Sequence, residues 1–180
     1  MTVASSRPYV LERRQWLPLA LGETFGFFAE PANLPRITPP WLGFRILTPP
    51  PLVMGLDLTI DYRVRVMGWP VHWRSLISEY DPPRAFRDVQ LVGPYRTWDH
   101  MHRFWEEDGG TVVHDRVVYE PPLGPLGALL NALVIRRQLD AIFEYRGERI
   151  GALLLGSRAQ ALPLGPAGVT RGLPETCVER

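Results

Sequence analysis

The feature that most constrains the fold is a long run of alternating apolar and charged residues between positions 56 and 120. Apolar side chains occupy every second position from Ile60 to Val66, and charged side chains lie between most of them. This two-residue period is typical of strands with one buried and one exposed face. Asp108-Gly109, near the end of the run, suits the positive φ angles of a tight hairpin turn. The pattern predicts consecutive antiparallel strands over 58–66, 71–77, 85–92, 97–105 and 111–119.

The segments on either side of this run have different patterns. We predict a strand over 9–16, short helical segments over 19–29 and 32–37, and a second strand over 41–47. From about residue 126 to 150, apolar residues recur at the three- and four-residue spacing of a helix. This order of elements predicts an α+β fold in which a curved antiparallel sheet wraps around the long C-terminal helix.

The length of 180 residues indicates one domain. We expect a flexible leader over 1–8, the folded domain over 9–150 and a flexible tail over 151–180. The tail is rich in Gly, Pro, Ala and Leu without a clear period, and chain ends are often loosely held.

Composition excludes several classes of function. The net charge of +1 argues against a nucleic-acid partner. All 20 basic residues are arginine, which excludes lysine-based catalysis, and the single cysteine, Cys177, excludes an intrachain disulfide or a cysteine-rich metal site. We find no phosphate loop or dinucleotide fingerprint, so no cofactor is expected. No signal peptide and no integral membrane segment are predicted, and we expect a soluble cytoplasmic protein.

The charged residues indicate which face of the sheet is exposed, because charged side chains are seldom fully buried. The outer face is predicted to carry Asp61, Arg63, Arg65, Arg74, Arg87, Asp99, Arg103 and Arg116. The opposite, inner face carries Ile60, Tyr62, Val64, Trp73, Ile77, Phe86, Trp98, Phe104, Val113, Val117 and Tyr119. Six inward positions are polar: Ser75, Asp88, Gln90, His100, His102 and Asp115. Because buried polar groups need partners, this concentration predicts a site on the inner face.

The predicted hairpins bring these polar residues into pairs. With Asp108-Gly109 at the turn, His102 lies opposite Asp115. A three-residue bend between the third and fourth strands places Asp88 opposite His100. Each histidine then has a carboxylate within reach across the ladder.

Two further pairings follow from the same bends. The bend after the third strand places Gln90 opposite Trp98. A turn centred on Gly68-Trp69 would place Tyr62 opposite Ser75.

Two segments resemble a known superfamily. The first, within residues 18–33, contains Glu23, Phe25, Phe28, Pro31 and Asn33. The second has the pattern Phe86-x-Asp88-x-Gln90-x-x-Gly93-Pro94-x-x-x-Trp98-x-His100-x-His102-x-Phe104, followed by Gly110-Thr111-x-x-x-Asp115-x-Val117-x-Tyr119. Over about 9–150 the chain resembles START-like SRPBCC proteins of the polyketide-cyclase/dehydrase and coenzyme-Q-binding types, and in particular a bacterial subgroup described as ligand-binding or cyclase/dehydrase-like.

The resemblance implies a helix-grip fold, in which a seven-stranded antiparallel sheet grips the C-terminal helix around a mainly apolar cavity. Members of the superfamily bind lipids, sterols, polyketides, quinones or plant hormones, and a minority catalyse reactions. The implied partner is a hydrophobic small molecule, while protein partners and the oligomeric state stay open.

The candidate ligand-binding residues are Tyr62, Trp73, Ser75, Phe86, Asp88, Gln90, Trp98, His100, His102, Phe104, Asp115 and Tyr119. Three functions remain open. The protein could carry or sense a hydrophobic molecule, or act as a cyclase- or dehydratase-type enzyme in which His102, Asp115 and His100 transfer a proton. It could also be an interaction module with a vestigial cavity. No metal site is predicted, because these residues match no recognised metal-binding spacing.

Overall fold

The computed structural model describes residues 8–156 and 168–171. Its antiparallel strands form one sheet in the order β2-β3-β4-β5-β6-β7-β1-β8. The strands are β1 (Tyr9–Leu17), β2 (Arg45–Ile46), β3 (Thr59–Val66), β4 (Trp69–Asp81), β5 (Ala85–Val92), β6 (Thr97–Glu107), β7 (Gly110–Glu120) and β8 (Gly168–Arg171). The helices are α1 (Leu21–Phe28), α2 (Leu34–Ile37), α3 (Gly124–Leu130) and α4 (Arg136–Leu155). Single 3₁₀ turns lie at Pro31–Asn33 and Pro40–Leu42, and the π-helical segment Asn131–Ile135 joins α3 to α4.

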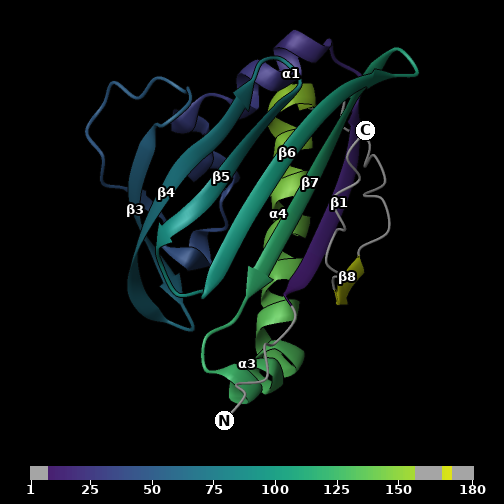
Figure 1. The fold of residues 1–180 in the computed structure, drawn as a ribbon. Helices are drawn as coiled ribbons and strands as arrows, with labels where there is room; N and C mark the ends of the chain where they lie inside the picture. Colours follow the sequence, from purple (N-terminus) through teal and green to yellow (C-terminus); the bar gives the residue numbers. More distant parts are fainter. Residues whose placement is uncertain (1–7, 157–167, 172–180) are drawn as a thin grey trace, which may run out of the picture.

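The sheet curves around the long C-terminal helix (Figure 1). In that view α4 runs behind β5, β6 and β7, and α1 lies at one end of the sheet. The apolar side chains on the inner face of the sheet pack against those of the helix. An amphipathic helix and a sheet with one apolar face each need such a partner surface. The predicted α+β architecture is confirmed.

The hairpin between β6 and β7 confirms the predicted register. Asp108 and Gly109 have φ angles of 52° and 73°, which a two-residue hairpin turn requires. His102 pairs with Asp115 in the ladder. On the other side of β6, Asp88 pairs with His100, also as predicted.

The hairpin between β3 and β4 differs from the prediction. Its turn is Met67-Gly68, with φ angles of 51° and 86°, rather than Gly68-Trp69. Tyr62 therefore pairs with Trp73, and not with Ser75. A methionine at positive φ gives no sequence signal, since this conformation is usually occupied by Gly, Asn or Asp. The register moves by two residues, so each side chain keeps its predicted face.

Two other elements differ in extent. The strand predicted over 41–47 is confined to β2, because a 3₁₀ turn occupies Pro40–Leu42 and Gly43 follows with a left-handed φ of 52°. Helix α4 continues past residue 150 to Leu155, and β8 pairs with β1. The rest of the predicted leader and tail lies outside the described residues.

Candidate functional site

A cavity of about 180 Å³ lies between the inner face of the sheet and α4. Side chains of β3 to β6 form one wall, and α4 forms the opposite wall. Residues between Phe28 and Met54 line the remaining side. The cavity therefore lies where the predicted inner face meets the predicted C-terminal helix.

Aromatic side chains form much of the sheet wall. The rings of Tyr62 and Trp73 stack with their centroids 5.8 Å apart, and Trp98 meets Trp73 edge to face at 5.2 Å. Tyr95, from the bend between β5 and β6, packs on Trp98 at 4.9 Å. Interlocked rings of this kind are rigid, so this part of the wall has a fixed shape.

A hydroxyl pair interrupts the aromatic wall. The Tyr62 hydroxyl and Ser75 Oγ are 3.0 Å apart, and the Trp73 indole N–H donates to the same Ser75 oxygen at 3.2 Å. Burial raises the pKa of Tyr62 well above its ordinary value, so this phenol stays neutral. The pair can offer hydrogen bonds to a polar atom of a ligand.

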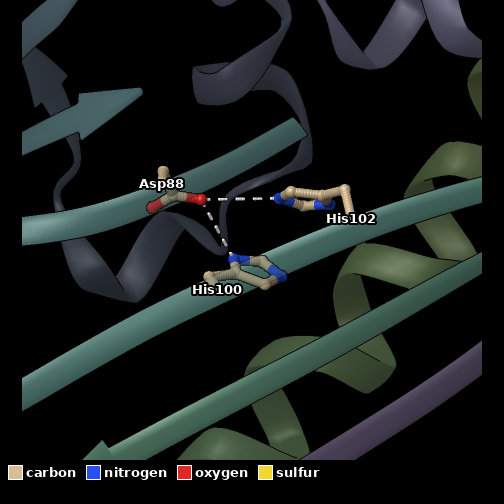
Figure 2. A group of neighbouring side chains, drawn as sticks. All are labelled: Asp88, His100 and His102. Carbon is tan, nitrogen blue, oxygen red and sulfur yellow. Dashed lines mark ion pairs between the residues drawn. The ribbon is translucent and has the colours of Figure 1, made fainter. Parts of the chain in front are cut away.

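Two histidines and two carboxylates form a closed ring beside the cavity. His100 Nδ1 and His102 Nε2 lie 3.4 and 3.5 Å from the same oxygen, Oδ2 of Asp88. Their other ring nitrogens face Asp115, whose Oδ1 lies 2.6 Å from His102 Nδ1 and 3.3 Å from His100 Nε2. Figure 2 shows Asp88 on β5 reaching across to both imidazoles on β6. Each carboxylate therefore contacts both histidines, beyond the separate pairs that the registers predicted.

The proton distribution in this ring follows from burial and charge. Burial tends to raise the pKa of Asp115, but His102 and His100 outweigh it and hold that pKa well below its usual value. The same two histidines also lower the pKa of Asp88 against the effect of burial. Both carboxyl groups are therefore ionised at neutral pH.

The two histidines differ in their protonation. Burial and the neighbouring His102 lower the pKa of His100, and the carboxylates only partly offset this. Burial also opposes charge on His102, but Asp115 and Asp88 reverse the effect and raise its pKa. A proton on the ring is therefore favoured at His102, and His100 stays neutral.

Helix α4 contributes residues that the sequence did not identify. Gln138, Ile142 and Phe143 line the cavity, as does Arg146. The Nε of Arg146 is buried and has no hydrogen-bond partner among the described residues. Helical periodicity indicates an apolar face, but it does not specify which polar residue at its margin reaches the cavity.

Eight of the twelve predicted ligand-binding residues line the cavity, and their role in binding stays a prediction. They are Tyr62, Trp73, Ser75, Phe86, Asp88, Trp98, His100 and His102. The other four, Gln90, Phe104, Asp115 and Tyr119, do not line the cavity and have other partners. Asp115 lies behind the two histidines, and Phe104 packs against Phe25 and Phe28 at ring distances of 5.3 and 5.2 Å.

Tyr119 and Gln90 have local partners instead. The Tyr119 hydroxyl donates to Asn131 Oδ1 at 2.9 Å. The Gln90 amide donates to the Tyr95 carbonyl oxygen at 2.7 Å, so this side chain holds the bend between β5 and β6. Its carboxamide packs so closely on Gly93 that any Cβ there would overlap it.

Comparisons with solved structures identify the architecture. Ms6760 from Mycobacterium smegmatis is 15% identical, with 82% of this chain and 92% of that chain aligned at a TM-score of 0.60. TTHA0849 from Thermus thermophilus is 18% identical, with 81% of this chain and 99% of that chain aligned at a TM-score of 0.58. Major latex-like protein 151 from Panax ginseng is 12% identical, with 81% of this chain and 97% of that chain aligned at a TM-score of 0.60. The chain has the helix-grip fold.

The START-like resemblance is thereby confirmed for the fold. No protein-family profile and no curated protein sequence matches the chain. A helix-grip sheet and helix hold the cavity, and the chemistry of the site has to be inferred from its own residues. Within the described part of the chain, we find no helix long and apolar enough to cross a membrane.

Proposed function

We propose that this protein binds a hydrophobic small molecule in the cavity between its sheet and α4, as a carrier or a sensor. The observation that carries the proposal is the composition of the cavity wall. Aromatic and aliphatic side chains dominate it, and a few polar groups converge on it, among them Tyr62, Ser75, Asp88 and Arg146. Walls of this kind favour an apolar ligand over water and use the polar groups to orient it.

The volume narrows the class of ligand. A buried apolar cavity of roughly 150 Å³ in another protein holds benzene. The cavity of about 180 Å³ therefore favours a compound with one or two rings, such as a quinone or a polyketide-like molecule, over a long acyl chain. Oxygen atoms on such rings would find donors at the Tyr62–Ser75 pair.

Native mass spectrometry of the freshly purified protein tests this proposal. We expect a co-purifying small molecule that organic solvent extracts and that returns on reconstitution. Ile142→Trp, on the helix wall, fills part of the cavity and should abolish retention. Val92→Trp adds the same side chain at an exposed position of β5 and should leave retention unchanged.

Two outcomes would replace the proposal with another function. Absence of any retained compound, together with no saturable binding of a short-chain quinone or a two-ring aromatic ketone, would favour the interaction module. Conversion of the bound compound, abolished by His102→Gln with its affinity unchanged, would favour the cyclase- or dehydratase-type enzyme.

A further inference from the structure

Three side chains of the buried ring form a set of metal ligands. Asp88, His100 and His102 each offer one ligand atom, and these atoms all lie within 4.8 Å of one another. All three residues line the cavity, and Figure 2 shows the two imidazoles turned toward the Asp88 carboxylate. We propose that they bind one divalent transition-metal ion at the cavity wall. This goes beyond the proposed function and does not depend on it. It differs from the sequence-based expectation of no metal site.

The spacing of the ligand atoms supports an ion between them. The distances of 3.4 and 3.5 Å from Asp88 Oδ2 to the two imidazole nitrogens are longer than ordinary hydrogen bonds. Two ligand atoms at about 2.0–2.1 Å from a zinc ion, at the tetrahedral angle, lie roughly 3.4 Å apart. Both oxygen–nitrogen separations therefore match this spacing, and all three ligand atoms lie within 4.8 Å of one another.

Two other histidine–carboxylate contacts among the described residues are tighter. On the outer face, His72 Nε2 lies 2.6 Å from Asp61 Oδ1. The same distance separates His102 Nδ1 from Asp115 Oδ1 on the other side of the ring. At His102 the wider spacing is therefore on the side of Asp88, whereas His100 is almost equally far from the two carboxylates, at 3.4 Å from Asp88 Oδ2 and 3.3 Å from Asp115 Oδ1.

Asp115 has the position of an outer carboxylate that orients metal-binding histidines. It contacts the nitrogen of each imidazole that points away from Asp88, at 2.6 and 3.3 Å. His100 Nε2 is hydrogen-bonded to Asp115, which leaves His100 Nδ1 with a lone pair for a metal ion. At His102 the ion would displace the proton from Nε2. Phe86 stacks on His102 at 4.2 Å and Phe143 meets His100 edge to face at 5.6 Å, so packing also fixes the ring planes.

The donor set indicates which ions would bind. Two imidazole nitrogens and one carboxylate oxygen suit Zn²⁺, Fe²⁺ or Co²⁺, whereas Mg²⁺ and Ca²⁺ prefer sites made only of oxygen. Three protein ligands leave at least one coordination position open. Because all three residues line the cavity, that position would accept an oxygen donor, such as the carboxylate or enolate of a bound molecule.

Isothermal titration with Zn²⁺ alone tests the proposal on the full chain after treatment with a chelator. We expect one ion per chain, with affinity lowered at least 100-fold by Asp88→Asn or His102→Gln. Asp115→Asn should weaken binding by about 10- to 100-fold, the usual effect of losing an outer partner. His72→Gln, which removes the exposed histidine of a similar pair, should leave the affinity unchanged.

Two further measurements keep the test decisive. Thermal unfolding without metal shows whether each variant folds. A folded Asp88→Asn or His102→Gln variant that keeps the wild-type affinity for Zn²⁺ would overturn the proposal. If those variants do not fold, the visible spectrum of the Co²⁺-loaded wild-type chain decides instead. Intense bands of a four- or five-coordinate ion are expected, and the weak spectrum of hydrated Co²⁺, or no saturable Zn²⁺ binding, would refute the site. No hydrophobic compound is used, so failure here is distinct from failure of the proposed function.

Discussion

Replacing Asp115 with alanine should destabilise the fold more than any comparable surface change. Its Oδ1 contacts His102 and His100, at 2.6 and 3.3 Å, and its side chain is only 11% exposed. Removal would take away the hydrogen-bond partner of His100 Nε2 and the close ion-pair partner of His102. Protonated His102 would also lose the negative charge that does most to raise its pKa, the carboxylate of Asp115.

The expected magnitude follows from the burial of this contact. Removing one partner of a buried ion pair costs about 3–5 kcal/mol. For a domain of this size, each kcal/mol lowers Tm by about 2–4 °C, so we expect Tm to fall by about 6–20 °C. This is a large part of the roughly 5–15 kcal/mol by which a typical domain is stable.

Urea unfolding and calorimetry of metal-free protein measure this loss, with Asp61→Ala as the matched control. Asp61 contacts His72 and Arg74, at 2.6 and 2.9 Å, on the outer face, where water screens the charges. Its removal should cost about 0–1 kcal/mol. Equal losses for the two variants would show that the buried ring contributes no more than a surface pair, and would refute this reasoning.

Three other predictions concern the rest of the fold. Burial raises the pKa of Tyr119 to about 12. The stability that the neutral Tyr119 phenol contributes should be complete below pH 10 and be lost as pH rises through 12, and urea unfolding at alkaline pH would measure the loss. A chain that ends after Ile150 should have a lower Tm than one that ends after Gly156, because α4 residues such as Leu154 pack on the core; equal values would contradict this packing. Gly110→Ala should cost about 1–3 kcal/mol in urea unfolding, since a backbone carbonyl of β1 overlaps the added methyl group, and wild-type stability would show that the hairpin can shift.

The sequence predicted the parts of the site that depend on strand alternation and on a recognisable turn. Alternation placed Asp88, His100, His102 and Asp115 on one face, and the Asp108-Gly109 turn set the register. The closed ring could not be predicted in this way. It depends on two imidazoles of one strand lying side by side, with centroids 3.8 Å apart, so that each carboxylate reaches both.

The residues that α4 contributes to the site could not be predicted from the sequence, for a different reason. The rotation of α4 against the sheet is set by packing, so no local signal places Arg146 in the cavity wall. Arg13 illustrates the same limit, because a charged residue is expected to be exposed. It is buried on β1 with an exposed fraction of 7%, and its guanidinium pairs with Asp140 of α4.

The aromatic wall gives the cavity an optical property of its own. The ring centroids of Trp73 and Trp98 are 5.2 Å apart with the ring planes at 89°, and Tyr62 stacks on Trp73. Excited states of rings this close are shared between them, and their fixed, chiral arrangement produces signed bands in near-ultraviolet circular dichroism. A molecule bound in the cavity would contact these rings and alter their coupling. The near-ultraviolet circular dichroism would then change even for a compound that absorbs no light itself.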